Sequence, residues 1–111
     1  MTFDEYNTEA AKTAVYPGKQ EFMGLCYTAL KLNGEAGELA ELVGKCLRDE
    51  AGIMSAKRRD KVAHELGDVL WYIAAIAREL DLNLDYVAHL NLSKLASRKE
   101  RGKLHGDGDY R

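Results

Sequence analysis

The stretch EFMGLCYTALKLNGEAGELAELVGKCLRDE, residues 21–50, decides the fold. Its apolar residues recur at alternating intervals of four and three, as in a helix that turns one face to a core. These positions are Leu25, Ala29, Leu32, Ala36, Leu39 and Val43. Ala51-Gly52 should end this helix. A second stripe at helical spacing then follows: Val62, Leu66, Val69, Ile73, Ile76 and Leu80. We therefore predict two long helices that pack against each other.

Two further helical segments flank this pair. We predict the four helices over residues 2–16, 21–50, 55–80 and 83–101. The first should stop before Pro17, because proline disfavours helix in the preceding residue, and Ser55 and Asn83 can cap the last two. Residues 102–111 contain three glycines and no apolar period, which indicates a loop or tail. With no convincing strand pattern, the fold class is all-α: a four-helix-bundle-like arrangement of antiparallel helices in one domain, residues 1–111.

Length and composition exclude several classes of protein. The chain has 111 residues, 46% apolar content and a formal net charge of −2, which argues against disorder and against a globally basic nucleic-acid binder. Its longest apolar run, residues 69–77, is about half as long as a transmembrane helix requires. No basic-then-apolar leader opens the chain, so we expect a cytoplasmic protein without a membrane segment. Cys26 and Cys46 would lie about 30 Å apart on one helix, which argues against a disulfide.

Two pairs of acidic residues stand out on the long helices: Glu35 with Glu38, and Glu65 with Asp68. At about 100° per residue, each pair lies at the edge of its helix's apolar stripe, whereas Glu41 should face solvent. In an antiparallel pair the four carboxylates converge and raise one another's pKa unless a cation neutralises them. Mg²⁺ and Mn²⁺ prefer oxygen ligands. We therefore predict a Mg²⁺ site that Mn²⁺ can also occupy, with separately solvated acids as the alternative.

The remaining polar residues do not form the motif of a di-iron site, and some of them suit a phosphate group. The Glu-x-x-His motif of ferritin-like di-iron bundles is absent. Tyr72 follows Asp68 by one turn, so its hydroxyl could touch a metal-bound ligand. Asn91, Lys94 and Arg98 share one helix face and together suit a phosphate group. The alternative is an exposed basic helix end, which the helix dipole favours. The glycine-rich tail could close over a phosphate through its backbone amides, or fray.

Some residues suggest close neighbours. Gly34 and Gly37 lie within the second helix, where each costs up to about 1 kcal/mol relative to alanine, so we expect a packed helix or a ligand to approach that backbone. Trp71 points about 170° away from its helix's apolar stripe, and Leu90 also points outward. Both favour a subunit interface and a homo-oligomer. The inward face of the fourth helix is predicted to consist of Leu84, Val87, Ala88, Leu92 and Leu95.

The two acidic motifs and the residues around them resemble the MazG-like, all-α nucleoside triphosphate pyrophosphohydrolases. The family pattern is Glu-x-x-Glu, a spacer and Glu-x-x-Asp, which the four acids match. The ending, through Arg101-Gly102 and a closing Gly-Asp-Tyr-Arg, is similar to that of a small single-domain branch, and the resemblance covers about residues 20–111. It implies dimers or tetramers, Mg²⁺ held by the four acids, and hydrolysis of an NTP or dNTP to the monophosphate and pyrophosphate.

The resemblance also implies that Tyr72, Asn91, Lys94 and Arg98 contact the triphosphate. Of the acids, Glu38 and Glu35 are our candidates for catalysis, with Glu38 expected to orient or deprotonate the attacking water. The alternative function is a non-catalytic helical bundle that binds a nucleotide, a protein partner or nucleic acid through the basic fourth helix. The intact set of four acids favours the enzyme. Nothing in the sequence identifies the nucleobase or the sugar.

Overall fold

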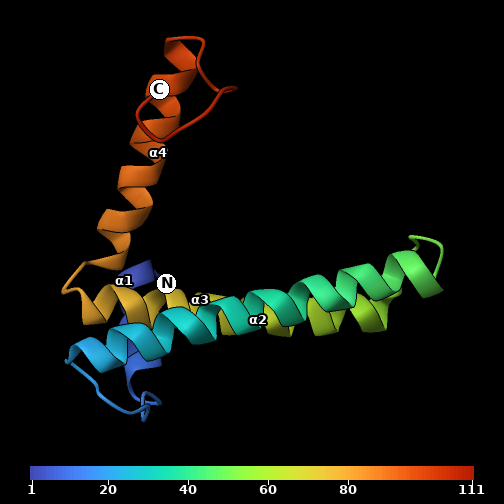
Figure 1. Cartoon of the computed structure of the whole chain (residues 1–111), viewed down its shortest axis with the longest axis horizontal. Helices are drawn as coiled ribbons and strands as arrows, with labels where there is room; N and C mark the ends of the chain where they lie inside the picture. The colour runs from blue at the N-terminus through green and yellow to red at the C-terminus, as the bar shows by residue number, and fades with distance from the viewer.

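The computed structural model describes all 111 residues and contains four α-helices and no strand (Figure 1). The helices are α1 (Phe3–Ala11), α2 (Phe22–Asp49), α3 (Ala56–Glu79) and α4 (Leu84–Glu100). The predicted all-α fold class is confirmed. No helix is both long enough and apolar enough to cross a membrane, and both cysteines are free, as expected.

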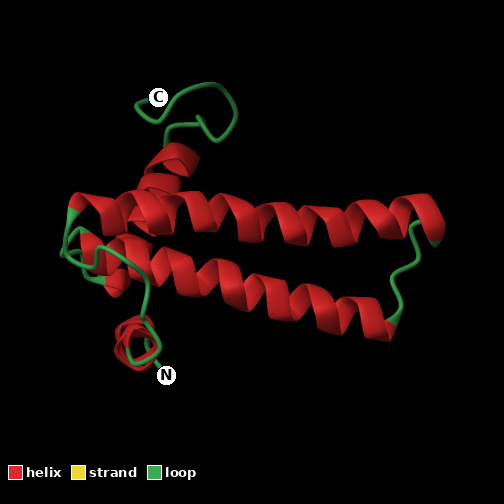
Figure 2. Ribbon diagram, turned by 60° about the horizontal axis from the view of Figure 1, so that its bottom comes forward, coloured by secondary structure: helices red, strands yellow, loops and turns green.

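The long helices α2 and α3 lie side by side as an antiparallel hairpin (Figure 2). The hairpin turns at Ala51 and Gly52, whose φ angles of +53° and +75° end α2 where the sequence predicted. Ser55 begins α3 by accepting a hydrogen bond from the Arg58 N–H, at 3.1 Å. The Arg58 guanidinium reaches back to the Glu50 carboxylate, with Nε 2.6 Å from Oε1. A cap and an ion pair therefore close this end of the hairpin.

The first helix is shorter than predicted and crosses the hairpin (Figure 2). The expected range of 2–16 is wrong after Ala11. Tertiary contacts hold the next residues in a non-helical path: the Trp71 Nε1 donates to Thr13 Oγ1 at 2.9 Å, and the Tyr16 hydroxyl donates to the Glu79 carboxylate. Because Tyr16 also precedes Pro17, helix is locally disfavoured there. The α1–α2 connection is thereby fixed against α3.

The fourth helix leaves the hairpin (Figure 1). Its first turn is anchored, since Leu84 is buried against Ala74 and Ala77 and the Phe3 N–H donates to Asp85 Oδ1 at 3.1 Å. Beyond that turn α4 projects away from the other helices. Two residues predicted to face inward are consequently exposed: Leu92 at 65% and Leu95 at 39%. The expected four-helix bundle is not closed within one chain, because no neighbouring helix covers this face.

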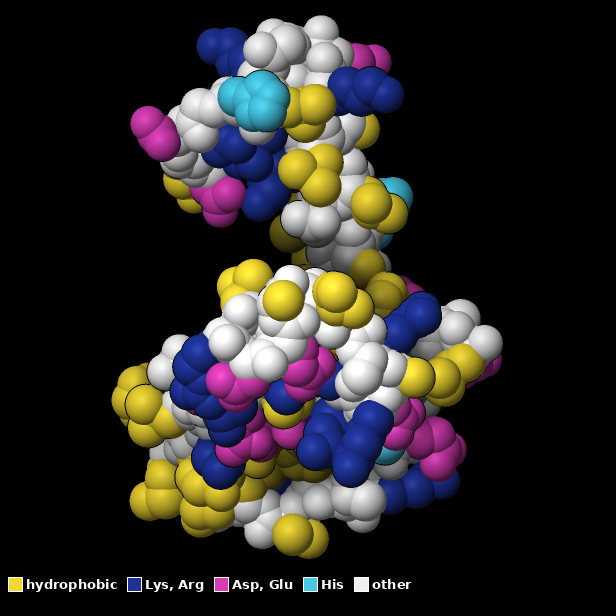
Figure 3. Space-filling view, turned by 90° about the vertical axis from the view of Figure 1, so that its right-hand side faces the viewer, with side chains coloured by type: hydrophobic (Ala, Val, Ile, Leu, Met, Phe, Trp, Pro, Cys, Tyr) yellow, Lys and Arg dark blue, Asp and Glu magenta, His cyan; other side chains and the backbone are white.

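The chain is more open than a compact monomer of its size. Its accessible surface is 7995 Å², whereas a compact monomer of 12.4 kDa exposes about 6,100 Å². The radius of gyration is 16.8 Å, against about 13 Å for a compact chain of this length. Hydrophobic side chains lie open on the hairpin and along α4 (Figure 3). The apolar stripe of α2 is only partly covered, with Ala36 and Val43 exposed.

Candidate metal centre

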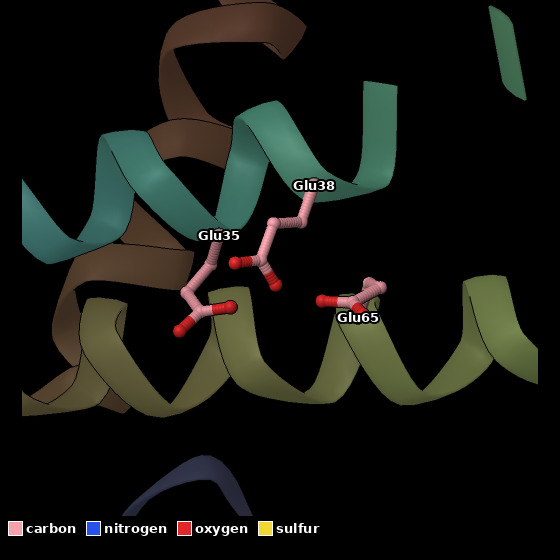
Figure 4. Close-up of side chains that lie close together, drawn as sticks. All are labelled: Glu35, Glu38 and Glu65. Atoms are coloured by element: carbon pink, nitrogen blue, oxygen red, sulfur yellow. The ribbon is translucent and has the colours of Figure 1, made fainter. Parts of the chain in front are cut away.

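Three carboxylates from both arms of the hairpin face one another (Figure 4). Glu35 and Glu38 project from α2 toward α3, and Glu65 projects from α3 toward α2. One oxygen of each lies within 4.8 Å of the oxygens of the other two. Because Glu35 and Glu38 are three residues apart, they share the face of α2 that meets α3. The structure thus brings together three of the four acids singled out in the sequence.

The fourth acid, Asp68, lies one turn further along α3. Its negative charge helps to raise the pKa values of Glu35 and Glu65 and, after burial, that of Tyr6 on α1. Its carboxylate is not part of the three-residue group, but it lines a cavity together with Glu35. We refer to Glu35, Glu38, Glu65 and Asp68 as the acid seam.

The acid seam carries unbalanced negative charge. Burial raises the pKa of Glu35, and the charges of Glu38 and Asp68 raise it further. The pKa of Glu65 is raised in the same way, by burial and then by Glu38. Oε2 of Glu65 is buried and has no hydrogen-bond partner. Buried polar atoms normally have partners, so an all-oxygen donor set with an orphaned carboxylate oxygen fits a hard divalent cation.

A cavity of about 320 Å³ opens beside the acid seam. It is lined by Thr13, Glu35, Asp68, Trp71 and Tyr72. Tyr72 therefore lies next to the acids, as expected from its position one turn after Asp68. Burial raises the pKa of the Tyr72 hydroxyl, so at neutral pH the group keeps its proton and can donate a hydrogen bond.

Sequence reasoning missed three residues near the acid seam. Lys31 precedes Glu35 by one turn, and its positive charge acts on both Glu35 and Tyr72; the spacing of four was the signal that could have found it. Trp71 was assigned to a subunit interface, but it packs within the chain against Tyr16 and Tyr72. Nothing in the sequence pointed to Thr13, because the segment that contains it was predicted to be helical.

The basic residues of α4 lie elsewhere. Asn91, Lys94 and Arg98 are on the projecting helix, and the structure does not bring them to the acid seam of the same chain (Figure 1). Lys94 Nζ lies 2.9 Å from Oδ1 of Asp109 in the tail, and the Arg98 Nη2 donates to the Asp109 carbonyl at 2.7 Å. Arg98 is only 5% exposed. We call Lys94, Arg98 and Asp109 the tail clamp.

The rest of the tail folds back along α4 (Figure 1). The Arg111 guanidinium donates to the carbonyls of Lys103, Leu104 and Gly108. Arg101 in turn donates to the Arg111 carbonyl at 2.8 Å. Arginine side chains therefore close residues 102–111 into a loop. This segment contains no helix, as predicted.

The glycines within α2 have open surroundings. A methyl group placed on Gly34 or Gly37 would meet nothing within 4 Å. The expectation that a packed helix or a ligand approaches this backbone is therefore not met by any part of the chain itself.

These features define an all-α protein with a carboxylate cluster inside a helical hairpin. The model of the MazG nucleotide pyrophosphohydrolase domain matches residues 27–102, which include the acid seam and α4. The chain therefore belongs to the MazG nucleotide pyrophosphohydrolase family. It is 46% identical to the Gene 37 protein of Mycobacterium phage L5 in an alignment of 114 positions that spans the full length of both chains. No solved structure gave a significant match.

Proposed function

We propose that this chain is a Mg²⁺-dependent nucleoside triphosphate pyrophosphohydrolase, which converts an NTP or dNTP to the monophosphate and pyrophosphate. The acid seam carries the proposal: three carboxylates from two helices lie within 4.8 Å of one another, and one buried oxygen lacks a partner. Mn²⁺ should substitute, because it accepts the same oxygen ligands. We further propose that residues 1–111 act as one MazG domain, in the cytoplasm, where its substrates are.

In the proposed reaction, water attacks the triphosphate and the bond between the α- and β-phosphates breaks. The acid seam would hold the metal, which when bound supplies positive charge to the phosphoryl oxygens and makes water more acidic. Glu38, the most exposed of the three clustered carboxylates, orients the attacking water or accepts its proton. Glu35 flanks the same position and is the second catalytic candidate. The Tyr72 hydroxyl donates a hydrogen bond to a phosphate oxygen.

The leaving pyrophosphate requires positive charge, and two sources are available. Lys31 lies beside Glu35 on the same chain. Asn91, Lys94 and Arg98 are also proposed to contact the triphosphate, but α4 projects away from the hairpin. They would therefore contact a triphosphate held by another subunit, where Lys94 and Arg98 would offset the charge on the leaving group.

We propose that the chain forms a homodimer or homotetramer. Its surface exceeds that of a compact monomer by about 1,900 Å², more than twice the roughly 800 Å² that each partner buries in a standard interface. A wholly hydrophobic groove of about 190 Å³, lined by residues that include Leu32, Ile73 and Leu84, remains open at the elbow between α3 and α4. Light scattering should find a dimer or tetramer, and Leu92→Glu should shift it toward monomer. A wild-type monomer at micromolar concentration would reject the proposal.

The function is tested by screening canonical and modified nucleoside triphosphates with Mg²⁺, scoring pyrophosphate separately from orthophosphate. We expect pyrophosphate and the monophosphate in equal amounts, and no turnover with a chelator. Glu38→Gln should abolish pyrophosphate release. Glu41→Gln is the matched control, because Glu41 is on the outer face of α2, 3.9 Å from Lys45 Nζ. Release of orthophosphate alone would reject this class of enzyme, and the absence of turnover would favour the non-catalytic bundle.

A further inference from the structure

The cavity beside the acid seam has an aromatic wall. The ring centroids of Trp71 and Tyr72 are 4.9 Å apart, with their planes at 78°, and both residues line the cavity together with Glu35 and Asp68. We infer that this cavity is the nucleobase subsite and that Trp71 is its stacking surface. The inference rests on the proposed function, because it takes the acid seam as the place where the phosphates bind.

The indole of Trp71 is held in place before any ligand arrives. Its Nε1 donates to Thr13 Oγ1 at 2.9 Å. The planes of Tyr16 and Trp71 are nearly perpendicular, with a centroid distance of 6.3 Å. The Arg78 guanidinium lies over the ring, 5.9 Å from its centre, so a base would stack on the face that Arg78 leaves open. A ligand that stacks on a fixed ring does not have to order it first, so less affinity is lost.

The cavity has a suitable size and position. Its volume of about 320 Å³ is at the lower end of the range for small-molecule sites, which is enough for one base. Glu35 and Asp68 line the same cavity as the aromatic pair. A nucleotide whose phosphates lie at these carboxylates has only its sugar between them and the base. The base therefore falls against Trp71.

The subsite has few groups that can recognise the edge of a base. The Trp71 N–H is used by Thr13, and the Thr13 hydroxyl donates its own hydrogen to the Ala10 carbonyl at 3.0 Å. Tyr72 and the two carboxylates serve the phosphates and the metal. Strong discrimination requires hydrogen bonds to the substrate that a wrong ligand leaves unpaired, whereas stacking tolerates any base. We therefore assign broad base tolerance to the site, with KM values for the four common bases within about tenfold of one another.

Trp71 is the only tryptophan of the chain, so its fluorescence reports on this subsite. Nucleoside monophosphates of each base should quench the emission saturably without any metal. Inorganic pyrophosphate with Mg²⁺, which has no base, should leave the emission unchanged. If no monophosphate alters the emission at concentrations that inhibit the enzyme, the subsite is not at Trp71. Quenching by monophosphates without hydrolysis of any triphosphate would overturn the proposed function and leave the base subsite standing.

Kinetics separate stacking from a merely structural role. Trp71→Ala should raise KM for nucleoside triphosphates about tenfold or more, with kcat little changed, and Trp71→Phe should restore most of the affinity. The inhibition constant of inorganic tripolyphosphate, which has no base, should stay the same in all three proteins. Tyr86→Leu, an exposed aromatic on α4, is the matched control. The subsite is overturned if Trp71→Ala weakens the binding of tripolyphosphate as much as that of nucleotides. It is also overturned if the KM values for the four bases differ more than 100-fold.

Discussion

The acid seam and the tail clamp both gather charged side chains, but with opposite balance. In the acid seam, like charges face one another, two pKa values are raised and a buried oxygen has no partner. In the tail clamp, Asp109 lies between Lys94 and Arg98, whose hydrogen bonds hold its pKa below the ordinary value. The clamp therefore pairs opposite charges within the chain, although the Nε of Arg98 is also buried without a hydrogen-bond partner, whereas the seam gathers charges of one sign. Where folding leaves a charged cluster unsatisfied, a ligand site is the simplest explanation.

The largest effect should come from neutralising the seam. Glu65→Gln should lower metal-dependent activity by at least about 100-fold, since losing even a group that only hydrogen-bonds to a metal ligand commonly costs 10- to 100-fold. The same variant should raise the thermal midpoint of the metal-free protein, because it removes a carboxylate that is repelled in the folded state. Calorimetry with a chelator and a pyrophosphate assay measure the two effects. A variant that is both inactive and less stable would contradict the account of the seam.

The opposite result is expected for the clamp. Arg98→Ala removes a buried guanidinium that hydrogen-bonds to the tail, which should cost about 1–3 kcal/mol in the free energy of unfolding. Denaturant titration measures this loss, and limited proteolysis should show cleavage within residues 102–111. Arg59→Ala, an exposed arginine on α3, is the control. If Arg98→Ala leaves the proteolysis of residues 102–111 unchanged, the tail clamp does not hold the tail.

The pH dependence of stability should also separate the two clusters. In the unfolded chain, Glu35 and Glu65 have the ordinary pKa of 4.5. Without metal, their pKa values are raised in the folded state, so just above pH 4.5 the folded chain keeps protons that the unfolded chain has released. Their contribution to stability is therefore fully present below pH 4.5 and is lost as pH rises through the raised values. Thermal midpoints of the metal-free protein should fall across this window. In Glu65→Gln, the thermal midpoint should fall less steeply with pH. If it falls as steeply as in the wild type, other groups cause the effect.

The smallest effect should come from the exposed member of the clamp. Asp109 has a lowered pKa, so the stability that it contributes is present above its ordinary value of 3.8 and is lost as pH falls through the lowered value. If Lys94 and Arg98 contact a triphosphate, Asp109 competes with it. Asp109→Asn should then lower KM modestly without changing kcat. A raised KM would mean that Asp109 positions the two cations rather than competing for them.

The sequence predicted most of what is local. The helical periodicity, the caps at Ser55 and Asn83 and the turn at Ala51-Gly52 depend on neighbouring residues, and the structure has them all. The convergence of Glu35, Glu38 and Glu65 also followed from spacing, once α2 and α3 are antiparallel.

Long-range contacts account for what the sequence did not predict. The early end of α1 depends on partners of Tyr16 and Thr13 that lie on α3, more than fifty residues away. The path of α4 depends on packing at Leu84, which periodicity does not reveal. The same periodicity placed Leu92 in a core that this chain alone does not build.

The open surface of the chain has a consequence for dosage. When folding and assembly bury the same apolar residues, stability depends on the concentration of the protein itself. For a dimer, each tenfold dilution removes about 1.4 kcal/mol of apparent stability. The activity of such a chain would rise more steeply than its abundance at low expression and in proportion to it at high expression. If the chain assembles as proposed, its activity has a threshold that is set by how many copies are present.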